Sequence, residues 1–302
     1  MNKKVNLFLV GAPKCGTTSL AQYLSYHPDI FLSKVKEPHY FAHQHILPPV
    51  NDYYNNFDKY SELFNSEVGQ NATYRLDASV WYYIHKAIAK DIFKYNPNAK
   101  ILMLIRNPFE AIKSLYNHRV MALEEDILDI NKAIELEKMR KLGSYIPKGL
   151  KKTSQGLFYS ENYKYADKIE NYISVFGKDQ VKVLLFDDLV MDKEKLLNDI
   201  FDFLGIEKMS LLKHTEKVFN KSIGNRNFTL NKFIKLLPVS IKRPFSSFFR
   251  NVVEPNILNK RPNKPFNDNI SDKTKERLML SYVRDWQLIE EKTNVNLNFW
   301  RK

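Results

Sequence analysis

The sequence predicts an α/β fold in which a central parallel sheet is flanked by helices, and two observations lead to this prediction. Three apolar runs have strand character, at residues 5–10, 100–105 and 181–186. Each run is followed by turn or capping residues and then by helical periodicity. This alternation is typical of parallel sheets, in which helices form the crossovers between strands.

The length and composition suit a single domain. The chain has 302 residues, of which 44% are hydrophobic, and this is enough to bury one large core. We expect one domain over residues 1–302, with a basic, aromatic insertion at about 232–265. No run of about 18 apolar residues occurs, so we expect no membrane span. The first apolar stretch ends at Gly11 and fits a strand better than a secretory signal.

Cysteine usage limits the chemistry and the compartment. Cys15 is the only cysteine, so intramolecular disulfides and cysteine-rich metal sites are excluded, and we expect no metal. A reducing cytoplasm fits this composition best, with peripheral attachment to the inner membrane face as an alternative.

The charge predicts a polyanionic partner. The formal net charge is +13 and 13% of the residues are aromatic. A nucleotide, an acidic glycan, a nucleic acid and an anionic membrane face all fit this balance. Because no zinc finger, ribonucleoprotein strand motif or basic zipper occurs, we do not expect specific nucleic-acid binding.

Several segments are predicted to be helical. A helix at about 83–95 should end at Pro97, and Asn107 should cap a helix that begins at Pro108. Glu110 would then close a capping box by bonding back to the cap residue. Further helical patterns cover 127–141, 161–175, 193–204 and 272–293, while about 27–56 is predicted to be a loop.

Residues 11–19 predict an anion-binding turn between the first strand and a helix. Gly11 and Gly16 permit a tight turn, and the first amides of the next helix lack partners within it, so they point toward an oxyanion. The Gly-x-x-x-x-Gly spacing copies nucleoside-triphosphate loops, but Thr17 stands where those loops carry lysine. The lysine is Lys14, inside the turn, where it suits a bridging leaving oxygen on a shorter nucleotide. A ligand-free turn with a surface lysine is the alternative.

A second candidate anion site follows the next strong strand. Arg106 ends that strand, and Ser114 lies eight residues later in the predicted helix. Because ligands collect at the carboxyl ends of parallel strands, Arg106 and the turn at Gly11 should lie on the same edge. A guanidinium and a hydroxyl suit a second phosphate, although a strand-end salt bridge and a solvated serine would look the same in sequence.

Several spaced motifs together resemble the sulfotransferases that use 3′-phosphoadenosine 5′-phosphosulfate (PAPS), most of all the carbohydrate branch with its heparan-sulfate enzymes and bacterial relatives. Residues 11–19 are similar to the 5′-phosphosulfate loop, and 104–108 with Ser114 are similar to the 3′-phosphate element. Further matching segments are His27-Pro-Asp29, Lys36-Glu-Pro-His-Tyr-Phe41, Phe186-Asp-Asp-Leu189, Phe203-Leu-Gly205 and Leu297-Asn-Phe-Trp300. The resemblance covers nearly the whole chain and implies a P-loop-like sulfotransferase fold.

This resemblance implies roles for individual residues. Lys14 would contact the bridging oxygen of the phosphosulfate, and Arg106 and Ser114 would grip the 3′-phosphate. Gly156 resembles a residue that approaches the adenine side, although it could equally be a loop hinge. The residues implied to surround the 5′-phosphosulfate are Lys14, Cys15, Gly16, Thr17, Thr18 and Ser19.

Two residues compete for the role of general base. Glu37 matches the carboxylate that in the heparan-sulfate branch takes the proton from the acceptor hydroxyl during in-line attack on sulfur. His39 is the rival, since imidazole titrates near neutral pH. The nonfunctional alternatives, judged by residue type alone, are that Glu37 is a solvated glutamate in a loop and that His39 is a packed histidine.

One segment departs from the resemblance. Some heparan-sulfate enzymes carry Glu-Lys-Ser-Pro-x-Tyr, with a lysine near the acceptor, where this chain reads Asp77-Ala-Ser-Val-Trp-Tyr82. Ala78 cannot supply that charge, which weakens any transfer of heparan-sulfate specificity. We expect that the Asp77 carboxylate can hydrogen-bond the acceptor substrate. We expect Trp81 either to pack in the core or to stack on a sugar ring.

Two basic segments admit several interpretations. The same resemblance implies that residues 220–227 form a loop that closes over the 3′-phosphate, although a basic loop is unremarkable in a chain this basic. Residues 232–261 carry seven Lys or Arg against one acid, Glu254, and are interleaved with phenylalanines. This stretch could pack on the domain, contact an anionic membrane peripherally or form a wall of the acceptor cleft.

The sequence therefore predicts an enzyme that transfers a sulfuryl group from PAPS to a hydroxyl or amine, on a carbohydrate or glycolipid acceptor. A P-loop kinase or other phosphotransferase is the enzymatic alternative, and a noncatalytic polyanion-binding protein on the same fold is the other. The acceptor, the position sulfated and the oligomeric state do not follow from the sequence.

Overall fold

A computed structural model describes residues 3–45, 55–148, 150, 153–210 and 266–301. These residues fall into two compact units. The first unit comprises the described residues of 1–112, 160–219 and 275–302, and the second those of 113–159 and 220–274. The prediction of a single domain stays a prediction.

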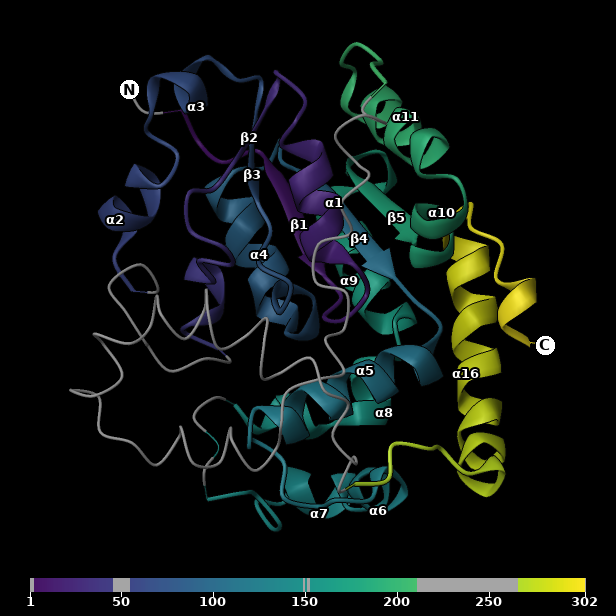
Figure 1. The fold of residues 1–302 in the computed structure, drawn as a ribbon. Coiled ribbons are helices and arrows are strands. Elements are labelled where there is room, and N and C mark those ends of the chain that lie inside the picture. The colour runs from purple at the N-terminus through teal and green to yellow at the C-terminus, as the bar shows by residue number, and fades with distance from the viewer. Residues whose placement is uncertain (1–2, 46–54, 149, 151–152, 211–265, 302) are drawn as a thin grey trace, which may run out of the picture. The chain divides into compact units, whose positions relative to one another are not determined.

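The first unit is built on a five-stranded parallel sheet (Figure 1). Its strand order is β2-β3-β1-β4-β5, so β1 is central. Every residue of β1 and all but the first of β4 are buried, as expected for parallel strands covered on both faces. The strands are β1 (Leu7–Gly11), β2 (Ile30–Leu32), β3 (Tyr74–Asp77), β4 (Lys100–Ile105) and β5 (Val181–Leu185). The predicted α/β fold with a parallel sheet is confirmed.

Strand register brings three chain segments to one edge of the sheet. Phe8 of β1 is paired with Asp77, the last residue of β3, and Gly11 is paired with Met103 near the end of β4. The carboxyl ends of β3, β1 and β4 therefore lie side by side. The segments that follow these strands begin at this shared edge.

Helices cover both faces of this sheet. Crossovers between parallel strands are right-handed. The crossover from β1 to β2 through α1 runs toward the β2 edge of the sheet, and the crossover from β3 to β4 through α4 runs toward the β5 edge, so α1 and α4 lie on opposite faces. α9 packs against α4. The helices that lie wholly in the first unit are α1 (Thr17–Leu24), α2 (Phe57–Glu62), α3 (Glu67–Asn71), α4 (Lys86–Tyr95), α9 (Ala166–Phe176), α10 (Phe186–Met191) and α11 (Lys193–Leu204), and two more, α8 (Tyr159–Asn162) and α16 (Asp272–Lys292), have their first residues in the second unit.

Local sequence signals fix some of these bounds. α11 covers the predicted 193–204, because the Asp192 side chain accepts a hydrogen bond from the Lys195 amide at 3.1 Å and Gly205 ends the helix in the left-handed conformation. The helix predicted at 83–95 begins only at Lys86, after a 3₁₀ turn over Tyr82–Ile84. The pattern at 161–175 is divided between α8 and α9.

The predicted loop at 27–56 is partly wrong. It contains β2 and a 3₁₀ turn over Tyr40–Ala42. β2 is only three residues long, so it shows no measurable alternation of polar and apolar residues. β3, at four residues, escaped prediction for the same reason.

The start of α5 (Pro108–Met121) follows the prediction in two respects, since the helix begins at Pro108 and Asn107 caps it. Asn107 caps the helix, because its Oδ1 accepts from the Phe109 amide at 3.0 Å. Glu110 does not close a capping box. Its carboxylate instead pairs with the Arg106 guanidinium at 3.4 Å.

The second unit is helical around a buried ion pair. The helix predicted at 127–141 is two helices, α6 (Ile130–Glu135) and α7 (Glu137–Lys141), since Asp129 caps the first and Leu136 separates them. The Arg140 guanidinium contacts both Glu125 carboxylate oxygens, at 2.8 and 2.7 Å. The Tyr159 hydroxyl donates to the same carboxylate at 2.8 Å.

Two predicted features fall outside the described residues, namely the loop at 220–227 and the basic stretch at 232–261 with its insertion bounds of 232–265. Among the helices that the structure describes, none has the length and apolar character needed to cross a membrane.

Glu125→Gln should strongly destabilise the protein. The substitution keeps the shape but leaves Arg140 charged and fully buried, which costs about 3–5 kcal/mol. The exposed Lys132–Glu135 pair gives a matched control, and Glu135→Gln should cost less than about 0.5 kcal/mol. Urea unfolding followed by circular dichroism measures both, and equal midpoints would contradict the assignment.

Candidate active site

The turn after β1 is set by two left-handed backbone positions. Gly16 has φ +88° and forms the cap of α1, and Lys14 has φ +65°. The Ala12 amide donates to the Leu104 carbonyl of β4 at 2.8 Å, which ties the turn to the neighbouring strand. The first amides of α1, at Thr17 and Thr18, have no i−4 carbonyl within the helix, as anion binding requires.

Two tyrosines hold this turn from outside. The Tyr163 hydroxyl donates to the Pro13 carbonyl at 3.1 Å. The Tyr165 hydroxyl donates to the Arg106 carbonyl at 2.9 Å and lies 3.6 Å from the Cys15 sulfur. Asp285 of α16 in turn accepts from the Tyr165 amide at 2.8 Å. Sequence reasoning missed these braces because they come from segments about 150 residues away along the chain.

Cys15 is a packing residue of the turn. Its side chain is fully buried, and burial raises the pKa of its thiol to about 12. The thiol is therefore protonated at neutral pH, and contact of Cys15 with the phosphosulfate stays a prediction.

Phe186 explains why the second glycine is needed. A Cβ on Gly16 would lie 2.8 Å from the Phe186 ring and 3.1 Å from Leu189. The same ring lies under the Arg106 guanidinium, with 4.5 Å between the guanidinium carbon and the ring centroid. The Phe186-Asp-Asp-Leu189 motif thus shapes both predicted anion-binding segments.

Arg106 touches the turn that carries Lys14. Its guanidinium donates to the Lys14 carbonyl at 3.4 Å, and its ion pair with Glu110 is solvent-accessible, since the Glu110 side chain is 62% exposed. Such a pair contributes little, at most about 1 kcal/mol. An anion that offers a better geometry would therefore displace Glu110 at low cost.

Glu37 and His39 form a hydrogen-bonded pair. The Glu37 Oε2 atom lies 3.2 Å from His39 Nε2, so the two rival bases act on one another. The Glu37 side chain is 26% exposed and the His39 side chain 8%. Glu37 is therefore the member of the pair that is more accessible to an acceptor.

Both residues of this pair are held in strained backbone conformations. Glu37 has φ +53° and His39 has φ +55°, on either side of Pro38. A left-handed conformation costs a non-glycine residue roughly 1–2 kcal/mol. Five described non-glycine residues have positive φ, and three of them are the predicted catalytic residues Lys14, Glu37 and His39. Such strain concentrates at functional sites.

The expectation that Asp77 bonds an acceptor is wrong. Asp77 has no exposed surface, and its carboxylate accepts from Ser79, Tyr60 and Tyr82 inside the core. Trp81 is 9% exposed, which favours core packing over stacking on a sugar.

The two remaining predicted residues belong to the second unit. Ser114 is partly buried in α5. Gly156 lies in the 3₁₀ turn Ser154–Leu157, where a Cβ would come within 2.1 Å of the Arg119 guanidinium. The close approach at Gly156 is therefore made by Arg119, and contact with adenine stays a prediction.

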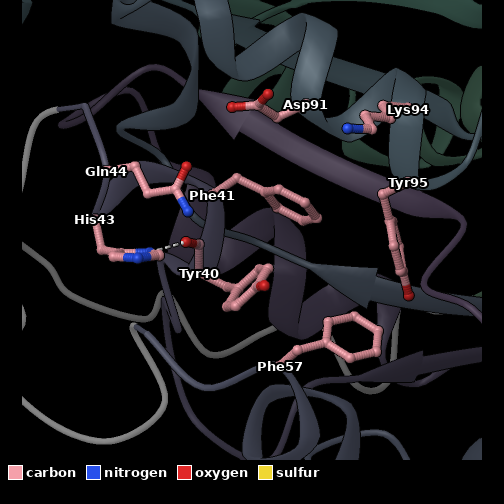
Figure 2. Close-up of a pocket in the computed structure, with 8 residues that line it drawn as sticks. All are labelled: Tyr40, Phe41, His43, Gln44, Phe57, Asp91, Lys94 and Tyr95. Carbon is pink, nitrogen blue, oxygen red and sulfur yellow. Dashed lines mark hydrogen bonds between the residues drawn. The ribbon is translucent and has the colours of Figure 1, made fainter.

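A pocket of about 320 Å³ lies elsewhere in the first unit (Figure 2). It contains none of the predicted site residues. His43 Nδ1 lies 2.6 Å from the Tyr40 carbonyl oxygen. Figure 2 shows this bond, with Asp91 and Lys94 of α4 opposite. Its lining is Tyr40, Phe41, His43, Gln44, Phe57, Asp91, Lys94 and Tyr95.

The residues of the candidate site thus follow three neighbouring strand ends. The turn with Lys14 follows β1, Arg106 follows β4, and the Glu37–His39 loop is bonded to the segment after β3 through Ser79. In the part of the chain that the structure describes, no group of His, Cys, Asp and Glu could hold a metal ion.

Comparison with known proteins defines the class. The sulfotransferase domain model matches residues 4–250, so the chain belongs to this family. The family prediction is confirmed, and with it the prediction that the protein is an enzyme of the sulfotransferase class.

Individual relatives are distant. A solved sulfotransferase from Alicyclobacillus acidocaldarius is 26% identical, with a TM-score of 0.68, over 99% of this chain and 100% of that one. Carbohydrate sulfotransferase 15 from Homo sapiens is 22% identical over 68% of this chain and 44% of its own length. Bifunctional heparan sulfate N-deacetylase/N-sulfotransferase 4 from Mus musculus is 24% identical over 66% and 22%. The chain spans less than half the length of these two curated relatives.

Gly16→Ala should destabilise the protein by more than the conformational cost of placing alanine at a left-handed position. Gly205 is a matched control, since its φ is +67° and a Cβ there meets no atom within 4 Å. Both substitutions carry the conformational cost, but only Gly16→Ala also displaces the Phe186 ring, which adds about 1–3 kcal/mol. Thermal unfolding compares them, and an equal loss of stability would argue against the packing of Phe186 on Gly16.

Proposed function

We propose that this protein transfers a sulfuryl group from PAPS to a hydroxyl of a carbohydrate or glycolipid acceptor. The observation that carries the proposal is the turn after β1, in which Lys14 is held in a left-handed conformation and its carbonyl is bonded to Arg106. A cationic turn joined to a second cation suits a nucleotide with phosphates at both ends.

The residues present fit this donor. The helix start at Thr17 and Thr18 offers amides and hydroxyls to the 5′-phosphate, and Gly16 lets the backbone approach closely. Arg106 would exchange its weak contact with Glu110 for the 3′-phosphate, with Ser114 as a further donor. When bound, PAPS supplies the sulfuryl group.

The chemistry assigned to this chain is a single in-line displacement. Glu37 accepts the proton of the acceptor hydroxyl as its oxygen forms the new bond to sulfur. The bond from sulfur to the bridging oxygen breaks, and the Lys14 ammonium stabilises the negative charge left on that oxygen. His39 donates to Glu37 through Nε2 and keeps the carboxylate oriented, while Glu37 remains the base.

A carbohydrate acceptor is supported by the names of the curated relatives, which are a carbohydrate sulfotransferase and a heparan sulfate N-sulfotransferase. Ala78, in place of the lysine found in some heparan-sulfate enzymes, argues against the same specificity here. The cytoplasmic location predicted from the single cysteine remains part of the proposal.

Transfer from radiolabelled PAPS to a panel of glycans, glycolipids and small alcohols tests the activity. Lys14→Ala should lower kcat/KM by about 10²–10³-fold, because charge on the leaving oxygen loses its stabiliser. Glu37→Gln should lower kcat by about 10²–10⁴-fold. Lys195→Ala, an exposed position on α11, is the control and should match the wild type.

Retention of full activity in Glu37→Gln together with its loss in His39→Gln would transfer the base role to His39. Folded protein that transfers sulfate to no acceptor in the panel, while binding glycans tightly, would favour the noncatalytic alternative.

Nucleotide titration separates this proposal from a kinase. The protein should bind 3′,5′-adenosine bisphosphate without metal, and Arg106→Ala should weaken that binding by about tenfold or more, since a charge-assisted bidentate contact is lost. Isothermal calorimetry with the bisphosphate and with ATP plus magnesium provides the comparison. Tight ATP binding with no bisphosphate binding would reject the proposal.

A further inference from the structure

We infer that Asp77 and Ser79 are positioning residues that hold the Glu37–His39 pair in its working geometry, an inference that rests on the proposed sulfuryl transfer. Asp77 ends β3 and has no exposed surface. Its Oδ1 accepts from the Ser79 hydroxyl at 2.6 Å, and the Ser79 oxygen accepts from the backbone amide of His39 at 2.9 Å. The Asp77 carboxylate is therefore connected to the Glu37–His39 loop through the Ser79 hydroxyl.

A second arm leads from the same carboxylate to the same loop. Oδ2 of Asp77 accepts from the Tyr82 hydroxyl at 3.0 Å, and the Tyr82 oxygen accepts from the Phe41 amide at 3.3 Å. Two amides of the 37–41 loop, at His39 and Phe41, are thus fixed by one buried group. We call these two arms, Asp77–Ser79–His39 and Asp77–Tyr82–Phe41, the Asp77 relay.

The donor set of Asp77 suits a carboxylate. Hydroxyls of Ser79, Tyr60 and Tyr82 all donate to it, and the two oxygens of an ionised carboxylate can accept all three hydrogen bonds. Burial raises the pKa of this group above its usual value, and the three hydrogen bonds offset only part of that rise. A charged acceptor makes these bonds short and directional, which suits a group that must hold a position.

The loop needs such an anchor because its conformation is unfavourable. Glu37 and His39 are both left-handed, and such backbone persists only where its surroundings impose it. The 3.2 Å contact between Glu37 and the His39 ring depends on where the His39 backbone lies. Loss of the His39 anchor would let the base move away from the acceptor proton.

Ser79→Ala and Tyr60→Phe form a matched pair for the test. Each removes one buried hydroxyl that donates to Asp77, but only the Ser79 hydroxyl connects to the His39 amide. Because small misplacement of a reacting group costs up to about 100-fold, Ser79→Ala should lower kcat by about tenfold or more. The KM for PAPS should change less than about twofold, and Tyr60→Phe should keep kcat within about threefold.

Amide hydrogen exchange gives a readout that does not depend on activity. Protection of the His39 amide should fall in Ser79→Ala and persist in Tyr60→Phe, and protection of the Phe41 amide should fall in Tyr82→Phe. Equal kcat losses in Ser79→Ala and Tyr60→Phe, or unchanged protection of His39, would overturn the relay. If Ser79→Ala fails to fold, Tyr82→Phe and Ser79→Thr replace it, and Ser79→Thr, which keeps the hydroxyl, should have the kcat of the wild type, whereas Tyr82→Phe should lower it.

Different results would reject the proposed sulfuryl transfer and the Asp77 relay. A wild-type protein that transfers no sulfate rejects the proposed function, whereas His39 exchange still decides whether the relay holds the loop. A wild-type protein that transfers sulfate with kcat unaffected in Ser79→Ala rejects the relay alone.

Discussion

Parallel pairing of β3, β1 and β4 is the constraint on which the candidate site depends. Because all three strands run in one direction, the segments that follow them leave the sheet at the same edge. Lys14, Arg106 and the anchor of the Glu37 loop are contributed by these segments. A single antiparallel strand at the centre would send one of them to the opposite edge.

Close packing of glycine on aromatic rings gives this edge its shape. Gly11 would clash with Tyr83 if it carried a Cβ, at 2.7 Å, and Gly16 would clash with Phe186. The rings come from segments after β3 and β5, so the turn is held between neighbours on both sides. Glycine is required here both for its backbone freedom at Gly16 and for the space that it leaves.

Buried polar groups connect the site to the core. Tyr163 bonds to the Pro13 carbonyl inside the turn after β1, Tyr165 bonds to the Arg106 carbonyl after β4, and Asp77 bonds through hydroxyls to the loop that carries Glu37 and His39. Asp77 and Tyr165 are each satisfied by several partners, which makes a buried polar network rigid instead of costly. These bonds therefore tie the loops that carry Lys14 and the Glu37–His39 pair to the core of the first unit.

The sequence by itself determined the parallel α/β class, the glycine turn between β1 and α1 and the cap at Asn107, since these depend on local periodicity, glycine spacing and helix-end chemistry. It also identified Glu37 and His39 as rival bases, but only the tertiary structure decided that they contact each other. Short strands such as β2, the split of 127–141 at Leu136 and the burial of Asp77 were decided by packing. The physical reason is that hydrogen bonds between segments 40 to 150 residues apart, as between Ser79 and His39 or Tyr163 and Pro13, leave no periodic signal in the chain.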